Sequence, residues 1–78
     1  MGFIRKSIEI WDIVWFIRSG RIAKGRVIAK RYGGKVYEVR PLGEPDSLWH
    51  LTQQEVFRSR VSAYLTLQIN KLKGVIYE

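Results

Sequence analysis

The chain has 78 residues, 46% hydrophobic and 27% charged, which is enough for one globular domain with one compact core over residues 1–78. Fourteen Lys and Arg against seven Asp and Glu give a net charge of +7, a balance that favours polyanionic partners. The chain has no cysteine, so a disulfide framework and a thiolate zinc site are excluded.

Residues 1–7 are either ordered or disordered, and the first predicted element follows them. Residues 12–18 are mostly β-branched and aromatic, and they end at Ser19-Gly20, a pair that suits the positive φ angles of a tight hairpin turn. We therefore predict a strand, a two-residue turn and a second strand over residues 21–32. This register places Phe16 opposite Ala23.

A second two-residue turn is predicted at Gly33-Gly34, followed by a third strand over residues 35–40. In this register Tyr37 and Val39 share a face with Trp15, while Val27 lies on the opposite face. Both faces are then partly apolar, which a flat sheet cannot bury. We expect a bent second strand, or a bulge at Gly25 or at the turn, as in a small closed barrel.

The remaining chain predicts one more strand and a helix. A polar loop over residues 41–47 leads to a short strand ending at residue 51, so that the barrel strands occupy residues 8–51. A capping-box pattern predicts a helical turn over residues 52–58, and Ser59 caps a helix over residues 59–73. Its apolar stripe comprises Val61, Leu65, Ile69 or Gln68, and Leu72. Residues 74–78 form an edge strand or a frayed tail.

The sequence therefore predicts a mainly β fold of four to five antiparallel strands, with a short helical turn and one C-terminal helix. This order resembles that of SH3-like small barrels, and residues 12–27, which end in Gly25-Arg26-Val27, resemble the KOW-type variant. The resemblance implies contacts with RNA or partner proteins, as KOW-type domains make in ribosomal proteins and transcription elongation factors. A tudor-type aromatic cage, which holds methylated side chains, is an alternative with rings from Trp15, Tyr32, Tyr37 and Trp49.

Groups suited to catalysis are scarce. His50 is the only histidine, the carboxylates are scattered, and no glycine-rich segment precedes a helix as a phosphate loop would. We expect a non-enzymatic protein without cofactor or metal, and a small enzyme that acts only as an oligomer is the weakest of the hypotheses.

A basic strip is the candidate binding site, because no acidic residue lies between Asp12 and Glu38. Lys24, Arg26 and Lys30 alternate on one side of the second strand in the predicted register. Trp15 lies opposite Lys24 and Tyr37 opposite Lys30, which suits a nucleic-acid backbone, RNA or DNA, with supported bases. The candidate residues are Arg18, Arg21, Lys24, Arg26, Lys30, Arg31 and Lys35 with Trp15 and Tyr37. The alternative is that these cations only solvate an exposed face.

A second hypothesis is a protein-interaction adaptor or a homo-oligomer, in which Trp11, Trp15 and the helix over residues 59–73 dock a partner or a second copy of the chain. The longest apolar run, residues 13–17, has only the length of a strand. We therefore expect neither a signal peptide nor a membrane span, and we expect the protein in the cytoplasm.

Overall fold

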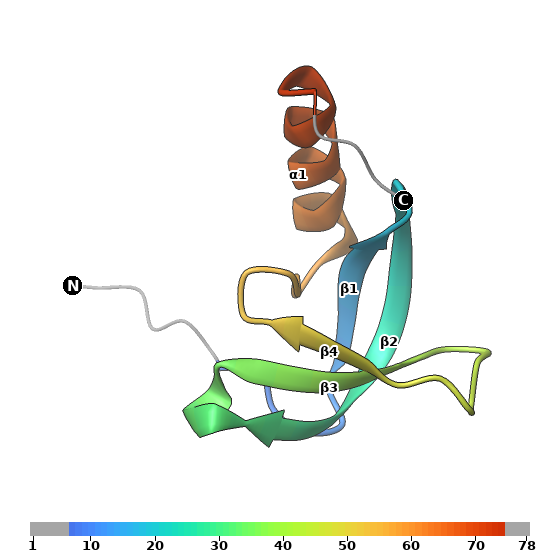
Figure 1. Cartoon of the computed structure of the whole chain (residues 1–78), viewed down its shortest axis with the longest axis vertical. Helices are drawn as coiled ribbons and strands as arrows, with labels where there is room; N and C mark the ends of the chain where they lie inside the picture. The colour runs from blue at the N-terminus through green and yellow to red at the C-terminus, as the bar shows by residue number, and fades with distance from the viewer. Residues whose placement is uncertain (1–6, 75–78) are drawn as a thin grey trace.

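The computed structural model describes residues 7–74, and they form a curled antiparallel half-barrel followed by a helix (Figure 1). The strands neighbour one another in chain order, β1-β2-β3-β4. The elements are β1 (Ile13–Arg18), β2 (Arg21–Arg31), the 3-10 turn η1 (Tyr32–Gly34), β3 (Val36–Pro41), β4 (Trp49–Thr52) and α1 (Arg60–Leu72). The predicted mainly β fold with a C-terminal helix is confirmed. The predictions for residues 1–6 and 75–78 lie outside the described residues.

The turn between β1 and β2 has the geometry that its two residues favour. Ser19 and Gly20 both have positive φ, 50° and 76°, as a type I′ hairpin turn requires. Phe16 pairs with Ala23, which confirms the register predicted for this hairpin.

A β-bulge in β2 decides which side chains enter the core. Val27 pairs with Val39 and Ala29 pairs with Glu38, so Ile28 has no partner on β3. One additional residue on one strand reverses the alternation of side chains beyond it. The predicted bulge therefore exists, at Ile28 instead of Gly25 or the turn, and the prediction that Tyr37 and Val39 lie on the face of Trp15 is wrong.

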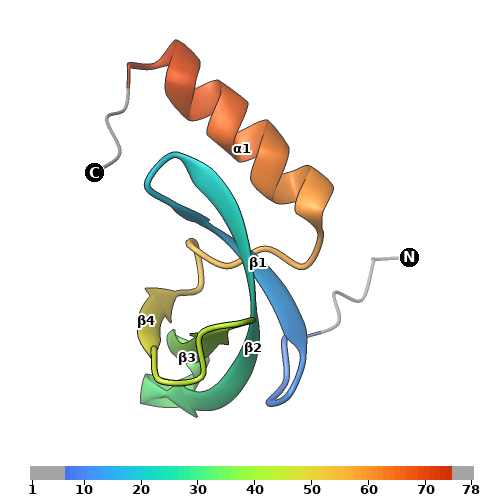
Figure 2. The same cartoon turned by 90° about the vertical axis from the view of Figure 1, so that its right-hand side faces the viewer.

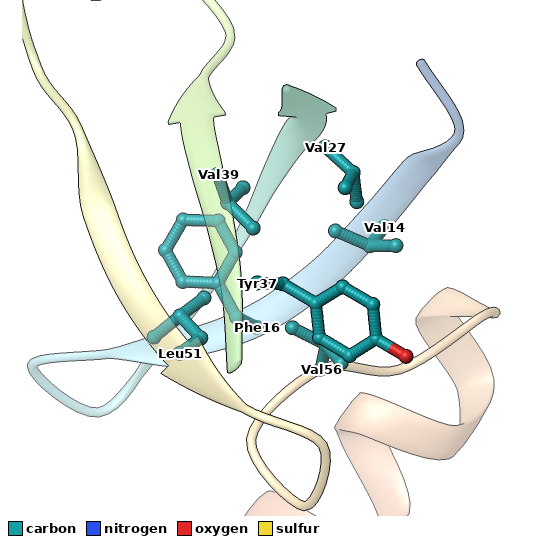
Figure 3. Close-up of a cluster of buried hydrophobic side chains, with 7 residues drawn as sticks. All are labelled: Val14, Phe16, Val27, Tyr37, Val39, Leu51 and Val56. Atoms are coloured by element: carbon teal, nitrogen blue, oxygen red, sulfur yellow. The ribbon is translucent and has the colours of Figure 1, made fainter. Parts of the chain in front are cut away.

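The core lies in the concave face of the half-barrel (Figure 3). We call this the inner face and the opposite one the outer face. Phe16 is fully buried in the core, and Trp49 packs beside it at 6.0 Å between ring centroids. The buried cluster comprises Val14, Phe16, Val27, Tyr37, Val39, Leu51 and Val56.

The connection between β2 and β3 is longer than predicted. Arg31 pairs with Val36, so residues 32–35 lie between the paired positions where two residues were expected. Within the turn, the Lys35 N–H donates to the Tyr32 carbonyl at 3.3 Å. The register next to the turn is nevertheless the predicted one, because the turn extends by one residue on each side and Arg31 still lies opposite Val36.

The segment after β4 returns the chain to the free edge of β1. Residues 53–55 form a single turn in which the Thr52 N–H donates to Glu55 Oε1 at 2.9 Å, so the predicted helical turn over residues 52–58 is shorter than expected. Phe57 and Trp15 then exchange two backbone hydrogen bonds of 2.8 Å. This single antiparallel bridge occupies the place of a fifth strand.

The helix α1 begins as predicted. Ser59 is its N-cap, and its hydroxyl oxygen accepts a hydrogen bond from the Ser62 N–H at 3.1 Å. Figure 2 shows α1 lying along the β1–β2 hairpin. In the part of the chain that the structure describes, no helix has the length and apolarity needed to cross a membrane.

The side of α1 that packs on the sheet is not the predicted one. Ala63 and Leu67 are the buried residues of the helix. A small residue allows the helix to approach the hairpin closely, and Leu67 follows one turn later on the same side. The predicted stripe is exposed, as is Tyr64 beside it: Val61, Tyr64, Leu65, Ile69 and Leu72 are 49–88% exposed. We call these five residues the apolar face of α1.

Candidate functional site

The predicted basic strip separates into groups with different surroundings. Three of its seven cations form ion pairs with carboxylates: Arg18 with Glu44 at 2.7 Å, Lys30 with Glu9 at 3.5 Å, and Arg31 with Glu38 at 3.2 Å. These acidic residues lie far from the strip in the sequence or at its end, and the fold brings them to it. The strip is therefore less positive than its sequence indicates.

Lys30 lies on a different face from Lys24 and Arg26, so the prediction that the three project from one side is wrong. Lys30 pairs with Tyr37, whose side chain enters the core, while Lys24 and Arg26 are exposed on the outer face. The bulge at Ile28 lies between them and reverses the alternation.

Two other predicted residues lie near opposite ends of β2. Arg21 begins β2, and Lys35 follows η1 at the other end. A strand of 11 residues spans about 35 Å, so one short ligand cannot contact both ends easily. Both side chains are exposed, and neither forms an ion pair among residues 7–74.

Arg18 holds the loop after β3 against the sheet. Its guanidinium donates to Glu44 Oε2 and lies 4.6 Å from the centroid of the Trp49 ring. The hydrogen bond from Arg18 lowers the pKa of Glu44 below its usual value, and the positive charge of Arg18 acts in the same direction. This arrangement makes Arg18 a structural residue.

A compact group of cations and indole rings remains on and beside the outer face. Lys24 Nζ lies 5.5 Å from the ring centroid of Trp15, which is its partner across the β1–β2 ladder, as predicted. Arg26 lies directly opposite Arg40 across the β2–β3 ladder. Neither arginine forms an ion pair with a carboxylate of the described residues. We call Trp11, Trp15, Lys24, Arg26 and Arg40 the outer cluster.

Arg40 belongs to the outer cluster although the sequence analysis did not include it. In the predicted register Arg40 lies opposite Val27, on the face of the core. The bulge at Ile28 moves it by one residue to face Arg26. The sequence signal for Arg40 is that it directly follows Val39: neighbouring residues of a strand point to opposite faces, so Arg40 is outside if Val39 is in the core.

Trp11 precedes β1 in an unusual backbone conformation. Its φ is 78°, in the left-handed region that residues with large side chains rarely adopt. Its N–H donates to the Val27 carbonyl at 2.6 Å, and its carbonyl accepts from Arg26 Nη1 at 2.9 Å. The side chain is 65% exposed.

An open pocket of about 280 Å³ lies next to Trp11. The loop after β3 forms one wall of the pocket, and the two arginines of the outer cluster form part of the lining. The lining residues are Trp11, Arg26, Ile28, Arg40, Pro41, Leu42, Gly43 and Pro45. The pocket therefore combines apolar walls with two cations.

Tyr37 does not belong to this surface. It is 6% exposed, and its ring packs in the core with only its hydroxyl directed out of the cluster (Figure 3). The prediction that it contributes an accessible ring beside Lys30 is therefore wrong. Nor do the four rings of the alternative aromatic cage converge, because Trp49 packs on Phe16, Trp15 lies on the outer face and Tyr32 is exposed in η1.

His50 is exposed, and its Nε2 lies 3.1 Å from Glu38 Oε1. Glu38 also pairs with Arg31, so the three residues form one polar network on β2, β3 and β4. His50 is thus a surface residue that hydrogen-bonds to a neighbouring strand. Among residues 7–74, no three His, Asp or Glu side chains are grouped as metal ligands would be.

Comparison with models of protein families, with curated proteins and with solved structures gives no match for this chain. The class of the protein is defined by its own structure. It is a small, mainly β half-barrel with a C-terminal helix, and a cluster of cations and indole rings lies on its convex side.

Proposed function

We propose that this protein is a non-enzymatic module of the SH3-like, KOW-type kind that binds nucleic acid through the outer cluster. The observation that carries the proposal is the direct pairing of Arg26 with Arg40, two cations that no carboxylate of residues 7–74 neutralises by an ion pair. Like charges directly opposite each other destabilise a sheet. An anion that lies between them removes this repulsion, and a phosphate matches the planar guanidinium donors with two parallel hydrogen bonds, as a carboxylate also does.

The neighbouring residues support a polyanion over a single small anion. Lys24 lies two residues before Arg26 on the same face of β2, and Trp15 and Trp11 flank the cations. Successive phosphates along a nucleic-acid strand can engage successive cations, and indole rings can support bases. The net charge of +7 attracts such a strand from a distance.

The proposal is tested by titrating a labelled oligonucleotide with the protein at several salt concentrations between about 50 and 200 mM and following fluorescence anisotropy. Three phosphate contacts predict that the logarithm of the affinity falls with that of the salt concentration with a slope of about −2 to −3. Weak binding without salt dependence contradicts the proposal.

A matched pair of variants separates the outer cluster from net charge. Replacement of Lys24, Arg26 and Arg40 by Gln is expected to abolish most of the salt dependence. The control replaces Arg60, Lys71 and Lys73, three exposed cations of the α1 region, by Gln and removes the same charge. Equal loss of affinity in both variants contradicts a specific role of the outer cluster.

The apolar face of α1 favours a second function, binding of a protein partner. Five large apolar side chains lie exposed on a helix of 13 residues. Residues 60–72 contain no acidic residue, whereas Arg60 and Lys71 lie near the two ends of the helix. Charge complementarity therefore favours a partner helix with an apolar stripe flanked by Asp and Glu over a second copy of this chain.

Binding of two synthetic amphipathic peptides tests this second candidate. Both carry the same leucine stripe, and one has Glu and the other Lys beside it. Preferential binding of the Glu peptide, lost on Leu65→Ser substitution, supports it. Equal binding of both peptides, or self-association of the free chain in sedimentation equilibrium, contradicts the acidic partner.

A further inference from the structure

The lining of the pocket beside Trp11 indicates which kind of ligand the outer cluster can bind. Ligand pockets for whole small molecules usually measure about 300–1,000 Å³, so a pocket of 280 Å³ suits a small planar fragment. Trp11, Ile28 and Leu42 provide apolar walls, and Arg26 and Arg40 contribute the cations. An apolar fragment with an adjoining anion is the ligand chemistry that such a lining recognises.

The indole of Trp11 is exposed, yet the backbone that carries it is held in place. The Trp11 N–H is bonded to Val27 and its carbonyl to Arg26, so both backbone groups are anchored to β2. Maintaining φ at 78° at a tryptophan requires such anchoring, and strained backbone is concentrated at binding sites. A tryptophan whose backbone is held before binding loses less conformational entropy when a ligand stacks on its ring.

The bulge beside Trp11 supports the same assignment. Ile28, the unpaired residue of β2, lines the pocket, and Val27 next to it accepts the hydrogen bond from Trp11. A bulge redirects side chains locally. Here it brings Arg40 opposite Arg26 and places Ile28 in the pocket, so one irregularity creates both the cationic and the apolar part of the lining.

The two indole rings of the outer cluster differ in accessibility. Trp15 is half-buried, and Lys24 Nζ lies 5.5 Å from the centroid of its ring. Trp11 is 65% exposed, and its ring makes no aromatic or cation–π contact within residues 7–74. Trp11 is therefore the ring on which a planar ligand can stack without displacing a protein group.

We infer that this pocket binds one unstacked base of a single-stranded nucleic acid, with the base on Trp11 and its phosphate between Arg26 and Arg40. The inference rests on the proposed function and narrows its ligand. Bases of a duplex are stacked and paired with each other and cannot enter a pocket of this kind, whereas a single strand presents the face of each base.

The test compares a single strand without secondary structure with a duplex of the same length at one salt concentration, for wild type, Trp11→Ala and Trp11→Phe. Wild type is expected to bind the single strand more tightly. Trp11→Ala is expected to weaken single-strand binding about tenfold and to leave duplex binding unchanged, because one stacked base contributes about this much. Trp11→Phe retains an aromatic face and should recover most of the affinity.

Two further readouts separate stacking from charge and from misfolding. The salt slope of Trp11→Ala should equal that of wild type, whereas Arg40→Gln should lower the slope by about 1. Circular dichroism and thermal melting show whether each variant is folded, and Leu48→Ala, an exposed apolar residue that does not line the pocket, is the control.

The outcomes distinguish the two proposals. Salt-dependent binding that is equal for single strand and duplex, and insensitive to Trp11→Ala, overturns the pocket and leaves the proposed function standing. Absence of salt-dependent binding to both overturns the proposed function as well. RNA and DNA single strands of the same sequence are both expected to bind, because base and phosphate are common to them; binding of the duplex forms alone contradicts the inference.

Discussion

Gly25 of β2 lies so close to β3 that a β-carbon on it would be 2.6 Å from Val39 Cγ1 and 2.8 Å from the Arg40 carbonyl oxygen. The second neighbour is backbone and cannot rotate away as a side chain could. This close approach lies next to the paired arginines of the outer cluster, because Gly25 directly precedes Arg26 on β2.

Gly25→Ala is therefore expected to destabilise the fold by about 1–3 kcal/mol, the cost of overpacking a close contact. Urea unfolding followed by tryptophan fluorescence measures the change. Lys24→Ala, at the neighbouring exposed position, is the control and should change the free energy of unfolding by about 0.5 kcal/mol or less. Equal effects of the two substitutions contradict the proposed contact.

Two leucines of α1 offer a comparison in which helix propensity is constant. Leu67 is 5% exposed and Leu65 is 55% exposed. Leu67→Ala is expected to cost about 2–4 kcal/mol because it leaves a cavity against the sheet, and Leu65→Ala about 0.5 kcal/mol or less. Urea unfolding of both variants measures the difference. A larger effect at Leu65 would mean that the apolar face of α1 is covered in solution.

The cap of α1 gives a third prediction. Ser59→Ala removes the acceptor of the Ser62 N–H and should lower the free energy of unfolding by about 1 kcal/mol. Ser59→Asp keeps an acceptor and places a negative charge at the helix N-terminus, so it should be as stable as wild type. Chemical unfolding of the three proteins decides this, and an unstable Asp variant contradicts the assignment of the cap.

The ion pair between Arg18 and Glu44 predicts a pH dependence. The pKa of Glu44 is lowered in the folded chain by its hydrogen bond with Arg18, so the pair stabilises the fold above the ordinary carboxyl value of 4.5. This contribution is lost as the pH falls through the lowered pKa. Glu44→Gln should therefore be less stable than wild type at neutral pH, and the difference should disappear in acid.

Urea midpoints measured at neutral pH and at several values below 4.5 check this dependence. Asp46→Asn lies in the same loop and removes a carboxylate that forms no ion pair among residues 7–74, so it serves as the control. A stability difference between Glu44→Gln and wild type that stays constant with pH contradicts the role of the pair.

The first hairpin and the strand order could be predicted from sequence because local residues determine them. Ser19-Gly20 specifies a two-residue turn, and the turn specifies the register. The bulge at Ile28 could not be located in this way, since it lies within Val27-Ile28-Ala29, where each residue suits either face of a strand. The faces predicted for Tyr37, Lys30 and Arg40 were wrong because the prediction did not place a bulge at Ile28.

The prediction of which side of α1 packs on the sheet was wrong for a different reason. The helical period identifies an apolar stripe, but it does not say whether that stripe meets the sheet. The helix instead packs through Ala63 and Leu67, where a small residue allows a close approach. For the candidate site, the sequence shows that cations are concentrated on β2, but the ion pairs of Arg18 and Arg31 depend on contacts that only the fold creates.

The paired arginines predict opposite effects on folding and on binding. Because Arg26 and Arg40 lie directly opposite each other, Arg40→Gln should raise the free energy of unfolding by about 0.2–1 kcal/mol at low salt. The gain should shrink in concentrated salt, which screens the repulsion. The same substitution should weaken binding of a nucleic-acid strand by about tenfold or more, since it removes one charge-assisted contact. Arg40 is the better position to test, because Arg26 also donates to the Trp11 carbonyl.

Urea unfolding at two salt concentrations and anisotropy titration on the same preparations measure both effects, with Arg60→Gln as the control. A variant that loses both stability and affinity would show that Arg40 supports the fold, and the anion site would then have to be placed elsewhere.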